Sequence, residues 1–163
     1  MSLEPLLAAD PVIRIHAFSA MAAFGLGAVI LWRRKGTPWH RALGAIWVVL
    51  MLIVAGTAFF IQEMRLIGPF SPIHLLALVT FIGLGRALWA IRVEHDIATH
   101  RAAMQALYLG SLLLAGAFTL LPGRRMHAVL FGPDAGWSPS LVVITAALLA
   151  ALISYRRMRR HGA

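Results

Sequence analysis

The sequence predicts an all-α integral membrane protein, in which two parallel two-helix repeats form a four-helix bundle and a fifth, C-terminal helix also crosses the membrane. Three observations predict it: an apolar composition, five long runs without charged residues, and an internal repeat that contains histidines. Of 163 residues, 60% are hydrophobic and 13% are charged, and the mean hydropathy is +0.80. A soluble domain is about 45–50% apolar and about 25% charged. The composition therefore excludes a water-soluble globule.

The five runs free of Asp, Glu, Lys and Arg are long enough to cross a bilayer, which takes about 20 helical residues. They cover residues 15–32, 42–61, 66–85, 102–123 and 135–155. We therefore expect one membrane domain over 1–163, with the four-helix core at 10–125 and the extra helix at 135–157. The connections contain Gly and Pro, as turns do, and none is long enough to be a catalytic domain.

Lys and Arg are divided unevenly between the two ends of the predicted helices. Ten lie after the first, third and fifth runs: Arg33, Arg34, Lys35, Arg41, Arg92, Arg101, Arg156, Arg157, Arg159 and Arg160. Four lie on the other side: Arg14, Arg65, Arg124 and Arg125. Because cytoplasmic loops carry the excess of basic residues, we expect the N-terminus outside and the C-terminus in the cytoplasm.

Composition and motifs also exclude several function classes. The net charge of +9 is placed at helix ends, which is typical of membrane topology and not of nucleic-acid binding. The absence of cysteine excludes disulfides, zinc fingers, Cys-ligated iron–sulfur clusters and thiol nucleophiles. No phosphate-binding loop, H-E-x-x-H helix or G-x-S-x-G motif occurs, so hydrolases and nucleotide-driven enzymes have no support.

The internal repeat pairs four histidines. His16 begins the pattern H-x8-GLG-x12-HRA, which reaches His40, and His74 begins H-x8-GLG-x14-HRA, which reaches His100. Each copy contains two spans, so both copies enter from the same side and should be related by a pseudo-two-fold axis along the membrane normal. The repeat therefore predicts His16 and His74 at one depth near the outer face, and His40 and His100 at one depth near the inner face.

Histidine pairs on neighbouring membrane helices suit the two axial positions of a haem iron. Imidazoles within membrane helices are costly to leave unpaired, which favours a functional interpretation; hydrogen bonding at helix ends is the structural alternative. The glycines of the repeat permit close helix packing, which we favour for them alone, or leave room for a porphyrin: Gly25, Gly27, Gly83 and Gly85.

Other polar residues add weaker signals. Arg41 and Arg101 either neutralise haem propionates or only reflect the excess of basic residues on the cytoplasmic side. Arg86 either meets a propionate, an anionic substrate or a quinone headgroup, or extends to the cytoplasm. His95 lies among acidic residues, as in a metal site or a solvated cluster, and His127 is a candidate contact for a substrate or partner.

Several segments carry a family resemblance: Ile15-His16-Ala17, Lys35-Gly36-Thr37 followed by His40-Arg41-Ala42-Leu43-Gly44, Phe70-Ser71-Pro72-Ile73-His74, His100-Arg101-x-x-Met104 and Leu121-Pro122-Gly123-Arg124. Over residues 10–125 the chain resembles bacterial predicted membrane proteins of domain-of-unknown-function family 2306. It is also similar to the cytochrome b561 superfamily, in which four core helices hold two b haems through histidine pairs on alternate helices. The resemblance implies an outer haem on His16 and His74, an inner haem on His40 and His100, and a bacterial inner-membrane location. The chain differs in having five predicted spans instead of six and no ascorbate-binding pattern.

We therefore expect a b-type haem electron-transfer protein with one or two haems, acting as a transmembrane oxidoreductase with a quinone or a redox protein as partner. One alternative is a non-enzymatic accessory subunit of a larger complex or homo-oligomer, in which the His-Arg pairs anchor helix ends. The other is a metal carrier or transporter that uses His16, His74 and Glu63, or His95 and His100, as ligands.

Overall fold

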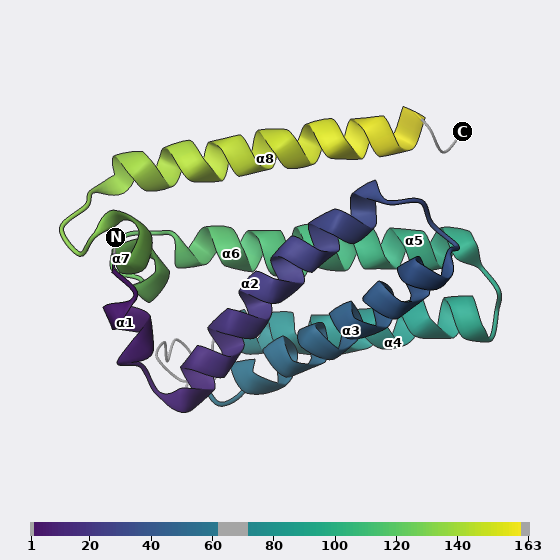
Figure 1. Ribbon diagram of the computed structural model, residues 1–163, viewed down its shortest axis with the longest axis horizontal. Helices are drawn as coiled ribbons and strands as arrows, with labels where there is room; N and C mark the ends of the chain where they lie inside the picture. Colours follow the sequence, from purple (N-terminus) through teal and green to yellow (C-terminus); the bar gives the residue numbers. More distant parts are fainter. Residues whose placement is uncertain (1, 62–71, 161–163) are drawn as a thin grey trace. The chain divides into compact units, whose positions relative to one another are not determined.

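The computed structural model describes residues 2–61 and 72–160, with side chains at 2–61, 74–149 and 152, and contains no strand among them (Figure 1). The chain divides into two compact units. One unit is Ala9–Ala115, and the other combines Met1–Ala8 with Gly116–Ala163. The predicted all-helical class is confirmed, and each unit is described separately below.

The unit Ala9–Ala115 is built from four long apolar helices. They are α2 (Pro11–Trp32), α3 (Pro38–Ala58), α4 (Pro72–Arg92) and a helix in three parts: α5 (Ile97–Ala106), the π-helical η1 (Leu107–Leu113) and α6 (Leu114–Thr119), which continues into the other unit. Each is long and apolar enough to cross a membrane. α2 packs on α3, α3 on α4, α4 on α5 and η1, and η1 on α2. The helices therefore close into a bundle, while the pseudo-two-fold symmetry remains a prediction.

The helices begin at capping residues that lie before the charge-free runs. The carboxylate of Asp10 accepts a hydrogen bond from the Val12 amide at 2.8 Å, and the Thr37 hydroxyl accepts one from the His40 amide at 3.1 Å. Asp96 caps α5 in the same way, and Pro11, Pro38 and Pro72 occupy the first helical positions. The charge-free runs of these helices begin after a charged residue in or next to the first turn, but a charged residue there is compatible with a helix. The predicted starts of these helices were therefore too late.

The third predicted span needs the largest correction. The run 66–85 was expected to be the helix, but α4 covers Pro72–Arg92; residues 66–71 lie outside the described part of the chain. The helix continues through Arg86, whose guanidinium pairs with Glu94 beyond the end of α4. A single charge near a helix end therefore does not terminate the span.

The core of this unit lies in the middle of the helices, around two hydrogen-bonded aromatic side chains. The Trp47 indole N–H donates to the Ala23 carbonyl at 2.9 Å, and the Tyr108 hydroxyl donates to the Phe24 carbonyl at 3.2 Å. A Cβ on Gly27 would lie 2.6 Å from the Tyr108 ring and 2.7 Å from Trp47 Nε1. Gly27 thus permits close packing of α2 on its neighbours.

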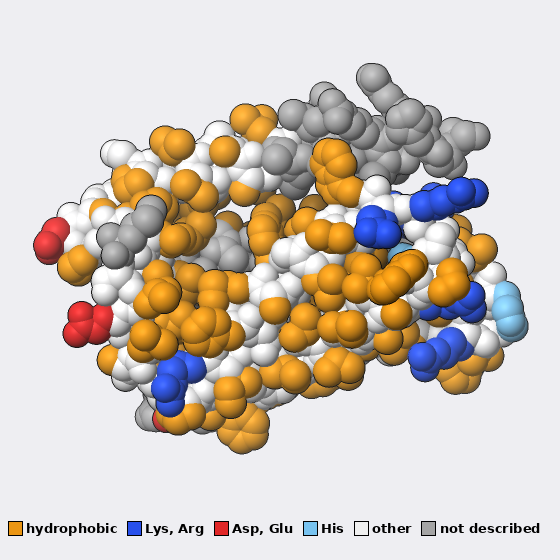
Figure 2. All heavy atoms as spheres, in the orientation of Figure 1, with side chains coloured by type: hydrophobic (Ala, Val, Ile, Leu, Met, Phe, Trp, Pro, Cys, Tyr) orange, Lys and Arg blue, Asp and Glu red, His pale blue; other side chains and the backbone are white. Residues whose placement is uncertain are grey.

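The other glycines of the repeat divide between packed and open positions. A Cβ on Gly83 would lie 2.8 Å from the Leu107 side chain, whereas Gly25 and Gly85 have nothing within 4 Å of that position. Large apolar side chains such as Phe18, Val49 and Ile82 are exposed, and Figure 2 shows hydrophobic side chains over much of the visible surface. Exposed apolar side chains are expected on membrane helices, because the lipid tails around the helices are themselves apolar.

The second unit contains three further helices. α1 (Glu4–Leu7) is tied to α7 (Arg125–Phe131) by a hydrogen bond from the Ser2 amide to the Val129 carbonyl at 3.2 Å. α8 (Trp137–Arg160) is a single helix at the position of the predicted fifth span, 135–155. Its apolar part with described side chains, Trp137–Leu149, is shorter than a membrane crossing. The fifth crossing therefore stays a prediction.

Candidate cofactor site

His16 lies on α2 beside the end of α3. Its Nδ1 is 3.0 Å from the Val54 carbonyl oxygen and 3.0 Å from the Thr57 hydroxyl oxygen. Thr57 donates its own proton to the Ile53 carbonyl at 2.6 Å, so its oxygen is free to accept. Nδ1 therefore carries the imidazole proton, and Nε2 keeps its lone pair for a ligand.

His74 lies near the start of α4, also beside the end of α3. Its side chain is buried, with 6% exposed, and its ring centroid is 5.9 Å from that of Phe59, the residue after α3. His16 and His74 thus share one end of α3, as the repeat predicts. Whether the two rings face one another remains a prediction.

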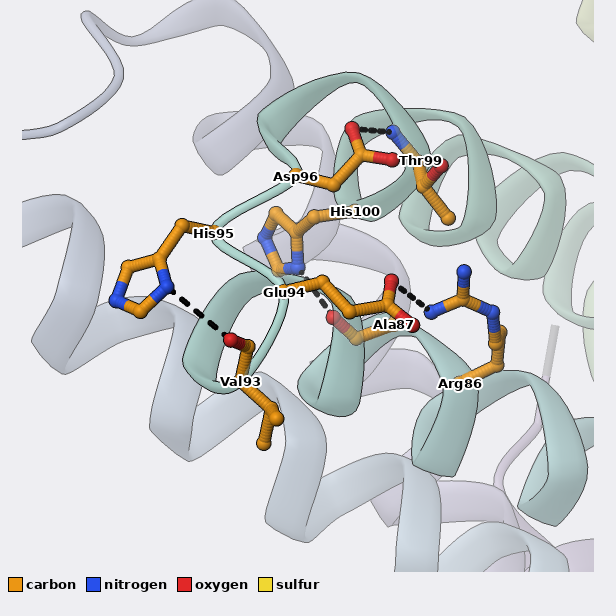
Figure 3. A network of polar contacts seen from close by, with 8 residues as sticks. All are labelled: Arg86, Ala87, Val93, Glu94, His95, Asp96, Thr99 and His100. Atoms are coloured by element: carbon orange, nitrogen blue, oxygen red, sulfur yellow. Dashed lines mark hydrogen bonds and ion pairs between the residues drawn. The ribbon is translucent and has the colours of Figure 1, made fainter.

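The other two histidines lie at the opposite end of α3. His40 is the third residue of α3 and His100 is the fourth residue of α5. The Nδ1–H of His100 donates to the Ala87 carbonyl at 2.9 Å (Figure 3), and its Nε2 has no hydrogen bond within the described part of the chain. The two inner histidines thus lie in the first turns of helices that begin at this end of the bundle, and whether their rings face one another remains a prediction.

The inner histidines differ in their hydrogen bonds. The Nδ1 of His40 is buried and has no hydrogen-bond partner in the described part of the chain, whereas that of His100 is bonded to Ala87. His40 and Thr57 are 17 residues apart on α3, or about 25 Å at the helical rise. The mid-helix core therefore separates two levels of histidines.

The arginines of the predicted site lie near the inner level. Arg41 and Arg101 directly follow His40 and His100 and are exposed. Arg86 donates from its guanidinium to a carboxylate oxygen of Glu94 at 2.7 Å, with both side chains more than a third exposed (Figure 3). The sequence suggested that Arg86 either contacts an anionic ligand or extends to the cytoplasm, and it did not predict the ion pair with Glu94. An ion pair between a helix and the loop beyond it has no periodic sequence signal.

The polar side chains of the loop before α5 do not point towards a common centre. His95 is exposed, has a φ of 56° and places Nδ1 3.2 Å from the Val93 carbonyl, away from its neighbours (Figure 3). Asp96 accepts hydrogen bonds from the Thr99 hydroxyl and amide, which hold the pKa of this carboxyl below its usual value. Across the described residues, no three His, Cys, Asp or Glu side chains come together to hold a metal ion. Glu63, a ligand of the metal-carrier hypothesis, lies outside those residues.

His127 is a buried structural residue in the second unit, with 1% of its surface exposed. Its Nε2–H donates to the Ala135 carbonyl at 2.8 Å, and its Nδ1 lies 2.8 Å from the Ser140 hydroxyl and 3.0 Å from the Leu120 carbonyl. Both ring nitrogens are therefore used inside the protein. This environment does not support the expectation of a substrate or partner contact.

The comparisons with known proteins identify a family. The family model described as "Predicted membrane protein (DUF2306)" matches residues 13–156. No curated protein and no solved structure matches the chain. The matched region contains three of the bundle helices in full, all of α2 except its first two residues, and most of α8. The chain therefore belongs to the DUF2306 family of predicted membrane proteins.

Proposed function

We propose that this protein is a b-type haem electron-transfer protein of the bacterial inner membrane, with a core similar to that of cytochrome b561. In this proposal His16 and His74 are the axial ligands of an outer haem, and His40 and His100 are those of an inner haem. The N-terminus lies outside and the C-terminus in the cytoplasm. A quinol dissolved in the bilayer, or a redox protein, is the expected electron partner.

The observation that carries the proposal is the way in which His16 and His100 are held. Each directs Nδ1 to a main-chain carbonyl on the adjacent helix, and its Nε2 has no hydrogen bond to the described residues. Metal-binding histidines are fixed in this manner, because the bond from the second nitrogen sets the tautomer and raises the basicity of the ligating one. His127 provides the contrast within the same chain, since its bonds occupy both nitrogens.

The donor set also favours haem over a free metal ion. The two levels offer imidazoles and no third metal-ligating side chain in the described residues, and two axial imidazoles are sufficient for a haem iron. When bound, a haem would supply a one-electron redox centre held by these imidazoles. Arg41 and Arg101 lie next to the inner histidines and supply positive charge for propionates.

A reduced-minus-oxidised visible spectrum tests this proposal directly. We expect the protein, expressed with haem supplied and purified, to show the bands of a six-coordinate b-type haem after addition of dithionite. His16→Ala or His74→Ala should remove the outer component or convert it to high spin, and His40→Ala or His100→Ala the inner one. His95→Ala is the matched control and should leave the spectrum unchanged. Wild-type protein without absorbance beyond the aromatic band would contradict haem binding.

The accessory-subunit alternative rests on the same hydrogen bonds interpreted as helix anchors. His16 joins α2 to the end of α3, and His100 joins α5 to α4. On this interpretation, His16→Ala and His100→Ala lower thermal stability or assembly, and no variant changes a visible spectrum because no chromophore is present. Elemental analysis for iron, copper and zinc on the same samples distinguishes the metal-carrier alternative from the other two.

A further inference from the structure

We propose that His127 is a pH-sensitive switch, in which protonation of the ring completes a hydrogen-bond network that joins the end of α6 to α7 and α8. The network lies within the second unit, so the inference goes beyond the proposed function and needs no haem. In the expected topology, the segment around Arg124 and Arg125 lies on the outer side of the membrane. The switch would therefore respond to the pH outside the cell.

The His127 ring is surrounded by oxygen atoms. Nε2 lies 2.8 Å from the Ala135 carbonyl oxygen, and Nδ1 lies 2.8 Å from the Ser140 hydroxyl oxygen and 3.0 Å from the Leu120 carbonyl oxygen. The Ser140 hydroxyl donates to the same Leu120 carbonyl at 2.5 Å. A carbonyl oxygen has no proton to donate, so every proton in these hydrogen bonds comes from the imidazole or from Ser140.

A neutral imidazole leaves this network one proton short. It carries a single N–H, which the Ala135 carbonyl places on Nε2. The Ser140 proton then bonds either to Nδ1 of His127 or to the Leu120 carbonyl, and the other hydrogen bond is lost. The imidazolium carries a proton on each nitrogen. In that state Nδ1–H donates to Ser140 while Ser140 donates to Leu120, and the network is complete.

Burial makes the missing hydrogen bond consequential. His127 is 1% exposed and Ser140 is 0% exposed, so water cannot replace it. A buried polar group without a partner destabilises the folded state, whereas a buried charge is tolerated where each N–H has an acceptor. The connections between α6, α7 and α8 should therefore be held more tightly when His127 is protonated.

The charged side chains nearest in the fold do not pair with the ring. They are Glu4 on α1, which packs on α7, Arg124 and Arg125 at the start of α7, and Asp134 in the connection to α8. Neither carboxylate forms an ion pair with His127 among the described residues. α6 and the described side chains of α8 include no charged group. The oxygens of the network therefore stabilise the imidazolium.

Hydrogen exchange of the full-length protein in detergent tests the switch. Exchange of residues 120–145 is measured at roughly pH 5.5 and roughly pH 8, on either side of the range in which imidazoles titrate, and is corrected for the intrinsic rate at each pH. We expect protection to be at least about tenfold greater at the lower pH, as for gain of one charge-assisted hydrogen bond. His127→Gln retains an N–H donor but cannot titrate, so this difference should disappear. His95→Ala removes an exposed histidine and should keep it.

Nitrogen-15 NMR of wild-type protein with labelled histidine gives a direct second measurement, which does not depend on the folding of a variant. The His127 ring is identified by its proximity to protons of Ala135 and Ser140. We expect protons on both nitrogens at the lower pH and on Nε2 alone at the higher pH. A neutral His127 ring at the lower pH would overturn the inference. Equal pH dependence of exchange in wild type and His127→Gln would also overturn it and would assign the effect to other groups, such as Glu4 or Asp134.

Discussion

The imidazole of His100 donates its Nδ1–H to the main-chain carbonyl of Ala87, 2.9 Å away on the preceding helix of the bundle. A main-chain acceptor does not depend on the side chain at position 87, so this bond is a property of the helix pair. His16 has the same kind of partner in Val54 but also contacts the Thr57 hydroxyl at 3.0 Å. Of these two histidines, His16 alone has a side-chain acceptor that a substitution can remove.

If the proposed outer haem is bound, Thr57→Val should therefore raise its reduction potential. Loss of the hydroxyl weakens the hydrogen bond from His16 Nδ1, so the imidazole becomes a poorer electron donor and stabilises the oxidised iron less. We expect a shift on the order of 20–40 mV, the one-electron equivalent of roughly 0.5–1 kcal/mol. Spectroscopic redox titration of the two haem components provides the measurement.

Thr80→Val is the control for this prediction. Thr80 is a buried threonine of α4 whose hydroxyl donates to the Leu76 carbonyl at 2.8 Å. Both components should keep their potentials in this variant. An equal shift in both components of Thr57→Val would indicate a general change of packing and would argue against a specific bond to the outer ligand.

The sequence was sufficient to predict the two levels of histidines, but not the groups that hold them. The duplicated pattern identified His16, His74, His40 and His100 because one repeat unit is copied in the chain. Every residue has a main-chain carbonyl, so the sequence does not indicate which one accepts a hydrogen bond from a histidine. The copies also differ: 12 residues separate GLG from His40 and 14 separate it from His100, and the caps lie three and four residues before these histidines. The two inner histidines also differ in hydrogen bonding: Nδ1 of His100 is bonded to the Ala87 carbonyl, whereas Nδ1 of His40 has no partner among the described residues.

Gly27→Ala should destabilise the bundle. The added Cβ would lie 2.6 Å from the ring of Tyr108 and 2.7 Å from Trp47 Nε1, and both side chains are buried and hydrogen-bonded to α2. Neither ring can move away without losing its bond. We expect a loss of about 1–3 kcal/mol in the free energy of unfolding, measured by thermal or denaturant unfolding in one detergent.

Gly25→Ala is the matched control, two residues away on the same helix. Nothing lies within 4 Å of its Cβ position, so the substitution adds helix propensity without a clash and should stabilise by about 0.5–1 kcal/mol. Effects of the same sign in the two variants would contradict the packing role assigned to Gly27.

His127→Ala should loosen the second unit without changing the visible spectrum expected from the proposed function. The substitution removes the donor to the Ala135 carbonyl and the partner of the Ser140 hydroxyl, in a site with 1% exposure. Unpaired buried polar groups and the resulting cavity should cost about 2–4 kcal/mol. Hydrogen exchange of residues 120–145 should become faster, whereas the exposed His95→Ala should not change it. Unchanged exchange in His127→Ala would contradict its structural role.

The charge-free runs predicted the number of bundle helices better than their ends. A run stops at the first charge, but a helix stops where its backbone is capped, and Asp10, Thr37 and Asp96 cap helices that begin before the runs. Arg86 lies inside α4, and its partner Glu94 lies beyond the end of that helix. Such pairing depends on the path of the chain in space, which hydropathy does not record.

A reporter fused after Ala163 should be active only in the cytoplasm. Ten basic residues lie on the predicted inner side and four on the outer side, and this bias sets membrane orientation. Five crossings from an external N-terminus place the C-terminus inside, whereas four place it outside. A second reporter in the connection 33–37, which follows a single crossing, should also report the cytoplasm and serves as the internal reference. Cytoplasmic activity at 33–37 with periplasmic activity after Ala163 would mean that α8 does not cross the membrane, since the four bundle helices alone account for that result.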